Sequence, residues 1–154
     1  MFFTPGQLRG SVGLSKEAFR HWKRVVPAFA NGRGHAPSFS LGDVLASAVL
    51  RRLTDAAGVR IGHLSDIAPA IFEVCNVLRW EMLQQKFLVI DLQEGTCVVA
   101  NDSSRPEGDL VVVCALAPLV KALQSDLLDG AATSAGTPME NQQNHRRVRN
   151  LVRR

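Results

Sequence analysis

The sequence predicts an α+β fold in three parts: a mainly α-helical part over residues 1–64, a helix followed by a small antiparallel β/α segment over residues 65–129, and a tail over residues 130–154. Three changes of pattern support this division. Apolar residues first recur at helical spacing, form short β-like runs from Lys86, and lose their period in the tail. The tail is rich in small and polar residues, so we expect it to be disordered.

Capping residues mark where the helices of the first part begin. Thr4 and Gln7 have the spacing of a capping box. Ser15 caps a second helix, Ser15–Arg24, and Ser40 caps a third helix that Gly58 ends. The first part therefore contains three short helices in succession.

A turn-rich stretch separates the second and third helices. Residues 29–39 have apolar ends around Asn31-Gly32, and Asn-Gly is the strongest short hairpin signal when strands flank it. We therefore expect a hairpin of two very short strands, whose loop carries Arg33 and His35.

Charge is distributed unevenly along the chain, although the net charge is only +4. Residues 1–62 carry nine Lys/Arg and three Asp/Glu, residues 63–129 carry four and ten, and residues 130–154 carry five and one. Dense positive charge on a small helical segment attracts a phosphate backbone, although charged side chains can also simply keep a protein surface hydrated.

The second helix separates aromatic side chains from charged ones. Phe19 and Trp22 lie three residues apart on one stripe, and most cations fall on the other side. Two short helices, a hairpin and a third helix form the layout of a winged helix-turn-helix, whose second helix enters the major groove of double-stranded DNA. The candidate DNA-binding residues are Ser15, Lys16, Glu17, Arg20, His21, Lys23 and Arg24 in the helix, and Arg33 and His35 in the wing.

The order of residues in this part resembles the mercury-resistance-regulator (MerR) family. The resemblance runs from Phe3 to Ile61. It is carried by Phe3-Thr4-Pro5-Gly6-Gln7-Leu8, Val12-Gly13-Leu14-Ser15, Arg20-His21-Trp22, Phe39-Ser40-Leu41-Gly42-Asp43-Val44 and Gly58-Val59-Arg60-Ile61.

The resemblance implies a role for three residues of the second helix. Arg20 would face the groove, His21 would touch the DNA backbone, and Trp22 would pack inside the protein. The sequence departs from the family pattern at Lys23, which replaces an acidic residue, and in the wing, which lacks an arginine-rich run. The long coiled-coil helix and the sensor segment of the family are not evident here.

The second part predicts an interface between two copies of the chain. Its apolar residues exceed what the small first part needs for its own core, and proteins that read DNA in this way commonly bind palindromic sites as dimers. We therefore expect a homodimer through residues 65–129. The expected elements are an apolar helix from Leu64 to Met82, which Pro69 either begins or kinks, β-like runs at 87–92, 96–100 and 110–114, and a helix at 118–128.

The cysteines do not indicate a metal site. Cys75, Cys97 and Cys114 are separated by spacings that match no short ligand motif, and we expect buried free thiols, no metal and no cofactor.

The sequence lacks a nucleophile elbow, a phosphate-binding glycine loop and a His-rich metal motif, so we expect no enzyme activity and no catalytic residues. Without a signal peptide or membrane span, the expected location is the cytoplasm, at the nucleoid.

The leading interpretation is a sequence-specific transcriptional regulator of a bacterium or phage. One alternative keeps the DNA binding but assigns it to an excisionase-like, architectural or segregation factor of a phage or mobile element. A second alternative is a protein–protein adaptor that binds no DNA.

The basic tail, with five arginines between residues 146 and 154, could add phosphate contacts or bind a protein partner.

Overall fold

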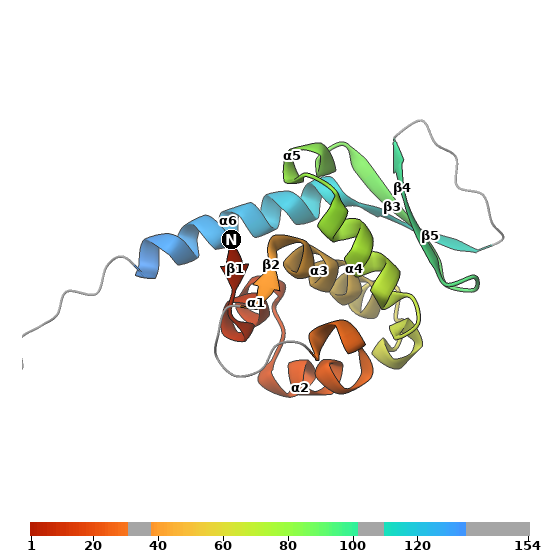
Figure 1. Cartoon of the computed structure of the whole chain (residues 1–154), viewed down its shortest axis with the longest axis horizontal. Helices are drawn as coiled ribbons and strands as arrows, with labels where there is room; N and C mark the ends of the chain where they lie inside the picture. The colour runs from red at the N-terminus through yellow and green to blue at the C-terminus, as the bar shows by residue number, and fades with distance from the viewer. Residues whose placement is uncertain (31–37, 102–109, 135–154) are drawn as a thin grey trace, which may run out of the picture.

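The computed structural model describes residues 1–30, 38–101 and 110–134 (Figure 1). The fold is mixed α+β, as predicted, with helices in the N-terminal half, small antiparallel sheets and a C-terminal helix. The elements are β1 (Phe2–Phe3), α1 (Pro5–Val12), α2 (Lys16–Val25), the 3₁₀ turn η1 (Pro27–Phe29), β2 (Phe39–Ser40), α3 (Leu41–Asp55), the 3₁₀ turn η2 (Ile61–Leu64), α4 (Ala68–Val77), α5 (Trp80–Leu83), β3 (Lys86–Asp91), β4 (Thr96–Asn101), β5 (Val111–Ala115) and α6 (Leu116–Ser134).

The predicted caps begin the first three helices. The Thr4 hydroxyl accepts a hydrogen bond from the Gln7 amide at 3.2 Å, and the Gln7 side chain accepts one from the Thr4 amide at 2.9 Å. The Ser15 hydroxyl accepts from the amide of Ala18, and Ser40 forms a capping box with Asp43. These contacts satisfy amides that the first turn of a helix leaves without partners.

Helix α3 lies at the centre of the molecule (Figure 1). It packs against α4, α1 and α6, and every residue from Val44 to Leu50 is buried. The sequence predicted only one apolar stripe on this helix, but neighbours on more than one side leave none of the residues from 44 to 50 exposed to water. Ser47 is the one polar residue in that run, and its hydroxyl donates to the Asp43 carbonyl at 2.6 Å.

The start of α3 is joined to the end of α4 by a close contact. The side-chain amide of Asn76 donates to the Asp43 carboxylate and to the Phe72 carbonyl, both at 2.9 Å, and it accepts from the Ser40 hydroxyl. Gly42 makes this approach possible, because a Cβ atom there would lie 2.8 Å from the Cα atom of Asn76. The two helices therefore meet through backbone at this point.

The second sheet has the order β4-β3-β5, with both pairs antiparallel. Its strands lie within a residue or so of the predicted β-like runs, and the turn at Gly95 has a positive φ of 66°. Leu88 and Ile90 of the central strand are fully buried in the core. One face of this sheet therefore packs against the helices.

The predicted helix from Leu64 to Met82 is wrong as a single element. The structure divides it into η2, α4 and α5: a turn over residues 65–67 separates η2 from α4, and the extended conformations of Leu78 and Arg79 separate α4 from α5. This break lets α5 turn back to pack against α6 and β3, where Leu83 is 1% exposed. Pro69 stands in the first turn of α4, so it begins this helix rather than kinking it.

The expected hairpin over residues 29–39 is also wrong. Phe29 ends the turn η1, and β2 pairs with the N-terminal strand β1, so that Phe39 lies opposite Phe3. Phe3 and Phe39 both enter the core instead of forming a separate ribbon.

At the other end of the chain, α6 continues to Ser134, so residues 130–134 are helical; the rest of the predicted tail lies outside the described residues.

One continuous core joins the first and second parts. It includes side chains from Phe3 of β1 to Leu123 of α6, and Ile71 and Phe72 of α4 belong to it. None of the helices in the three described ranges is long and apolar enough to cross a membrane.

We predict that Gly42→Ala destabilises the protein by about 1–3 kcal/mol, because the new methyl group would overlap the backbone of Asn76. Urea unfolding measures the change. Gly10→Ala is the matched control: Gly10 lies inside α1 with no atom near its missing Cβ, so alanine should raise stability by up to about 1 kcal/mol. Equal midpoints for Gly42→Ala and the unmodified protein would contradict the close contact.

Candidate nucleic-acid interface

Helices α1 and α2 form a helix-turn-helix with a turn of residues 13–15. Gly13 ends α1 with a φ of 70°, a left-handed conformation that glycine adopts without strain. The amide of Leu14 donates to the Arg9 carbonyl at 2.9 Å, and the Leu14 side chain is buried. Ser15 then caps α2. This turn fixes the direction in which α2 leaves α1.

Aromatic contacts hold one side of α2 to the core. Phe19 and Trp22 are 5% and 4% exposed. The Phe19 ring lies edge-on to Phe29, with 5.6 Å between centroids, and the Trp22 ring lies 5.9 Å from Phe29. Contacts of this kind add to the free energy gained by burial and restrict rotation of the helix about its axis.

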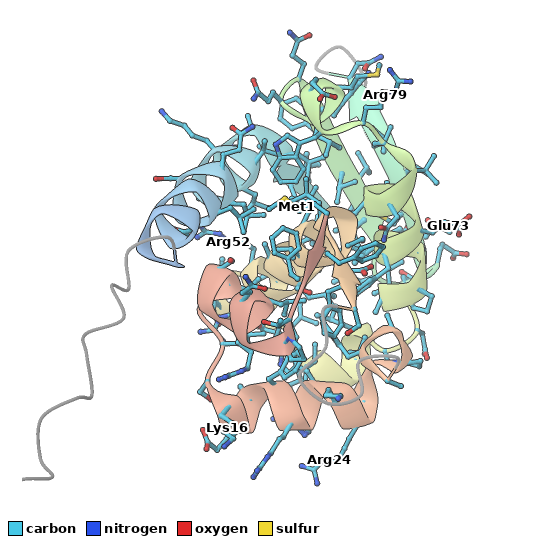
Figure 2. The ribbon with its side chains drawn as sticks, turned by 60° about the vertical axis from the view of Figure 1, so that its left-hand side comes forward. Met1, Lys16, Arg24, Arg52, Glu73 and Arg79 are labelled. Carbon is cyan, nitrogen blue, oxygen red and sulfur yellow. The ribbon has the colours of Figure 1, made fainter. Side chains whose placement is uncertain are left out.

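The other side of α2 is exposed and mainly cationic. The exposed residues repeat at helical spacing and are Lys16, Glu17, Arg20, His21 and Arg24. Figure 2 shows Lys16 and Arg24 at opposite ends of the helix, on the surface turned away from the body of the protein. Within the described part of the chain, Lys16, Arg20 and Arg24 make no ion pair with a carboxylate.

Three predicted residues are less free to contact a ligand. The Ser15 hydroxyl already accepts the capping hydrogen bond from Ala18. Lys23 is half-buried and has contacts within the protein. Glu17 lies in the first turn of α2, where a negative charge interacts favourably with the helix dipole and stabilises the helix. It therefore has a structural role whether or not it contacts DNA.

The two predicted wing residues, Arg33 and His35, lie outside the described residues. The structure instead draws attention to Arg60 and His63, which were not among the residues predicted from the sequence. Both are exposed, and His63 belongs to η2, which packs against α2. The positive charge of Arg60 was visible in the sequence, but nothing in the spacing of these two residues connected them to α2.

The cysteines are free, as predicted, and Cys75 and Cys97 are buried; Cys114 is only partly buried, which differs from the expectation of three buried thiols. Burial raises the pKa of the Cys97 thiol from 9.0 to about 11, with a smaller contribution from Cys114. Burial also raises the pKa of Cys75 and of Cys114. In the described ranges, no group of three His, Cys, Asp or Glu residues is arranged to hold a metal ion.

Comparison with known protein families, with curated proteins and with solved structures finds no match for this chain. The resemblance to the MerR family therefore depends on the residues quoted in the sequence analysis alone.

We predict that stability falls as the pH rises from about 9 to about 11. The folded protein holds the proton of Cys97 more tightly than the unfolded chain does, so this contribution is complete below pH 9 and disappears as the pH passes through the raised pKa. Urea unfolding at several pH values should show a decrease of about 1–2 kcal/mol that Cys97→Ala reduces. An unchanged pH profile in the variant would contradict this assignment.

Proposed function

We propose that this protein binds double-stranded DNA as a transcriptional regulator of the MerR-like type, with α2 in the major groove. The observation that carries the proposal is the division of α2 into two sides. Phe19 and Trp22 fix one side, and the other presents Lys16, Arg20 and Arg24 to solvent without intramolecular ion pairs in the described part of the chain. A fixed helix with an exposed row of cations is what recognition of a groove requires.

The spacing of these cations suits the dimensions of DNA. Lys16 and Arg24 are eight residues apart, a rise of about 12 Å along the helix, which is close to the width of the major groove. Their side chains can reach phosphates on either side while Arg20, midway between them, meets the base edges. An arginine forms two hydrogen bonds with guanine, so Arg20 is the proposed specificity residue.

The proposed regulator acts as a homodimer through the second part and resides in the cytoplasm, at the nucleoid. Genomic fragments selected by the protein would distinguish regulation from the architectural alternative. Sites within promoters support a regulator, whereas sites at recombination or partition loci would favour an excisionase-like or segregation factor.

We predict that Arg20→Ala lowers affinity for a selected duplex by about 5- to 150-fold, the value of one arginine–guanine pair. Fluorescence anisotropy with a labelled duplex measures this change. Arg79→Ala is the matched control, since Arg79 is an exposed arginine at the opposite end of the molecule (Figure 2) and should leave affinity unchanged.

Lys16→Ala should act differently from Arg20→Ala. It should weaken binding to all sequences and reduce the slope of log affinity against log salt by about 1, the effect of removing one cation from the phosphate backbone. If the unmodified protein has no affinity for selected or random duplexes at physiological salt, the DNA-binding proposal is wrong and the adaptor alternative is favoured.

We further predict that the basic tail binds phosphates. Removing residues 140–154 deletes five arginines, and the salt slope should fall by about 0.9 for each phosphate that these arginines neutralise. The measurement uses a duplex of random sequence, so that base recognition does not contribute. An unchanged slope would assign the tail to another role.

A further inference from the structure

A hollow of about 310 Å³ lies where helices α1, α3 and α6 meet, and each of these helices contacts the other two. We call it the three-helix pocket. Residues 11–13 at the end of α1 form one wall, and residues between 48 and 55 of α3 and between 119 and 123 of α6 form the others. Small-molecule sites have volumes from about 300 Å³ upward, so the size of the pocket suits a small ligand.

The floor of the three-helix pocket is apolar. Four aliphatic side chains line it, each no more than 9% exposed: Val12, Ala48, Leu119 and Leu123. All four belong to the continuous core, so the floor is already formed before a ligand binds. Such a floor favours the apolar part of a ligand over water.

The rim of the pocket carries charged side chains of α3. Arg51, Arg52 and Asp55 line the pocket, and all three are at least partly exposed. The Nε atom of Arg51 lies 2.7 Å from an Asp55 carboxylate oxygen, so these two charges balance each other. In the described part of the chain Arg52 makes no ion pair with a carboxylate, which leaves one unbalanced positive charge at the rim.

Arg52 also affects the Cys114 thiol. The positive charge of Arg52 lowers the pKa of this thiol, but burial has the larger effect and raises the pKa above its ordinary value of 9.0. Cys114 is therefore uncharged at neutral pH and does not neutralise Arg52. The guanidinium of Arg52 remains able to pair with an anion.

The pocket reaches the turn between α1 and α2 but not the cations of α2. A Cβ atom on Gly13 would meet nothing beyond its chain neighbours within 4 Å, so space remains beside this turn. In Figure 2, Lys16 and Arg24 lie along α2 at the bottom, whereas Arg52 lies higher, beside α6. A ligand in the pocket and a duplex on α2 would therefore contact different side chains.

We propose that the three-helix pocket binds a small organic acid, one carboxylate on a short aliphatic chain. The carboxylate pairs with the Arg52 guanidinium, whose planar shape allows two parallel hydrogen bonds. The aliphatic chain lies on Val12, Leu119 and Leu123. This inference goes beyond the proposed function and does not depend on it.

Charge and polarity together select this class of ligand. A cation would be repelled by Arg52, and Asp55, the one acidic residue among the described residues of the lining, is already paired. Inorganic phosphate would pair with the guanidinium but leave the apolar floor in contact with water. A neutral amide would cover the floor but leave the charge of Arg52 without a counter-ion.

Titration of the isotope-labelled full chain with hexanoate at constant ionic strength, followed by the NMR shifts of backbone amides, tests the proposal. Hexanoate has about eight non-hydrogen atoms, so we expect a dissociation constant of about 1 to 20 mM. The amides of Val12, Gly13 and Leu123 should shift with a single dissociation constant. No shift at these amides would overturn the proposal, and so would equal shifts at exposed residues elsewhere, such as Val77.

Hexanamide and inorganic phosphate are the matched control ligands. Hexanamide keeps the chain and lacks the charge, whereas phosphate keeps the charge and lacks the chain. Each should bind at least about tenfold more weakly than hexanoate, because each makes only one of the two contacts. Binding of either control with the affinity of hexanoate would overturn the proposed ligand class.

Arg52→Gln should raise the dissociation constant for hexanoate at least about tenfold, because glutamine lacks the charge that pairs with the carboxylate. Arg52 is exposed, and circular dichroism verifies that the variant is folded. Arg79→Gln is the matched control: it removes an exposed arginine at the opposite end of the molecule and should leave the dissociation constant unchanged (Figure 2). Equal affinities of Arg52→Gln and the unmodified protein would overturn the role of Arg52 and with it the proposal.

Ala122→Phe tests the pocket independently of charge. Ala122 is an exposed residue of α6 that lines the pocket, and a phenyl ring there would occupy the space of the ligand, so hexanoate binding should be lost. Ala117→Phe places the same ring on an exposed position of α6 outside this pocket and should bind hexanoate normally. Normal binding by Ala122→Phe would contradict the location of the site. None of these measurements contains DNA, so their outcome is separate from that of the DNA-binding proposal.

Discussion

The burial of Phe29 is the interaction on which the rest of the structure depends. Its ring is fully buried and lies 5.3 Å from Phe72 of α4, centroid to centroid, and within about 6 Å of the rings of Phe19 and Trp22 in α2. It therefore connects the cationic helix to a helix that comes more than forty residues later. A smaller side chain at position 29 would remove two of the ring contacts that orient α2 and its exposed face.

Features decided by neighbouring residues were predicted from the sequence. The caps at Thr4, Ser15 and Ser40 depend on hydrogen bonds that span three residues, so their chemistry can be read directly along the chain. The two sides of α2 follow from the helical period in the same way. The end of α4 was missed because Leu78 carries no breaker signal, and its extended conformation serves contacts that α5 makes with distant elements.

The distant partners of the aromatic residues could not be predicted. Phe29 and Phe39 bordered a turn-rich stretch and were interpreted as short strands of one hairpin, but hydrophobicity alone does not say which surface an aromatic ring will meet. Phe39 instead pairs with Phe3 at the start of the chain. Arg60 was missed for the same reason, since only the folding of η2 against α2 brings its surroundings near the candidate interface.

The continuous core also limits how this protein can evolve. Domains can recombine as modules when each has its own core, because such a unit keeps its shape when its neighbour is exchanged. Here Phe72 and Ile71 of the second part complete the packing of the first part, so replacing the second part would remove many of the side chains of a shared interior. Changes on one side of the shared core therefore constrain those that the other side can accept.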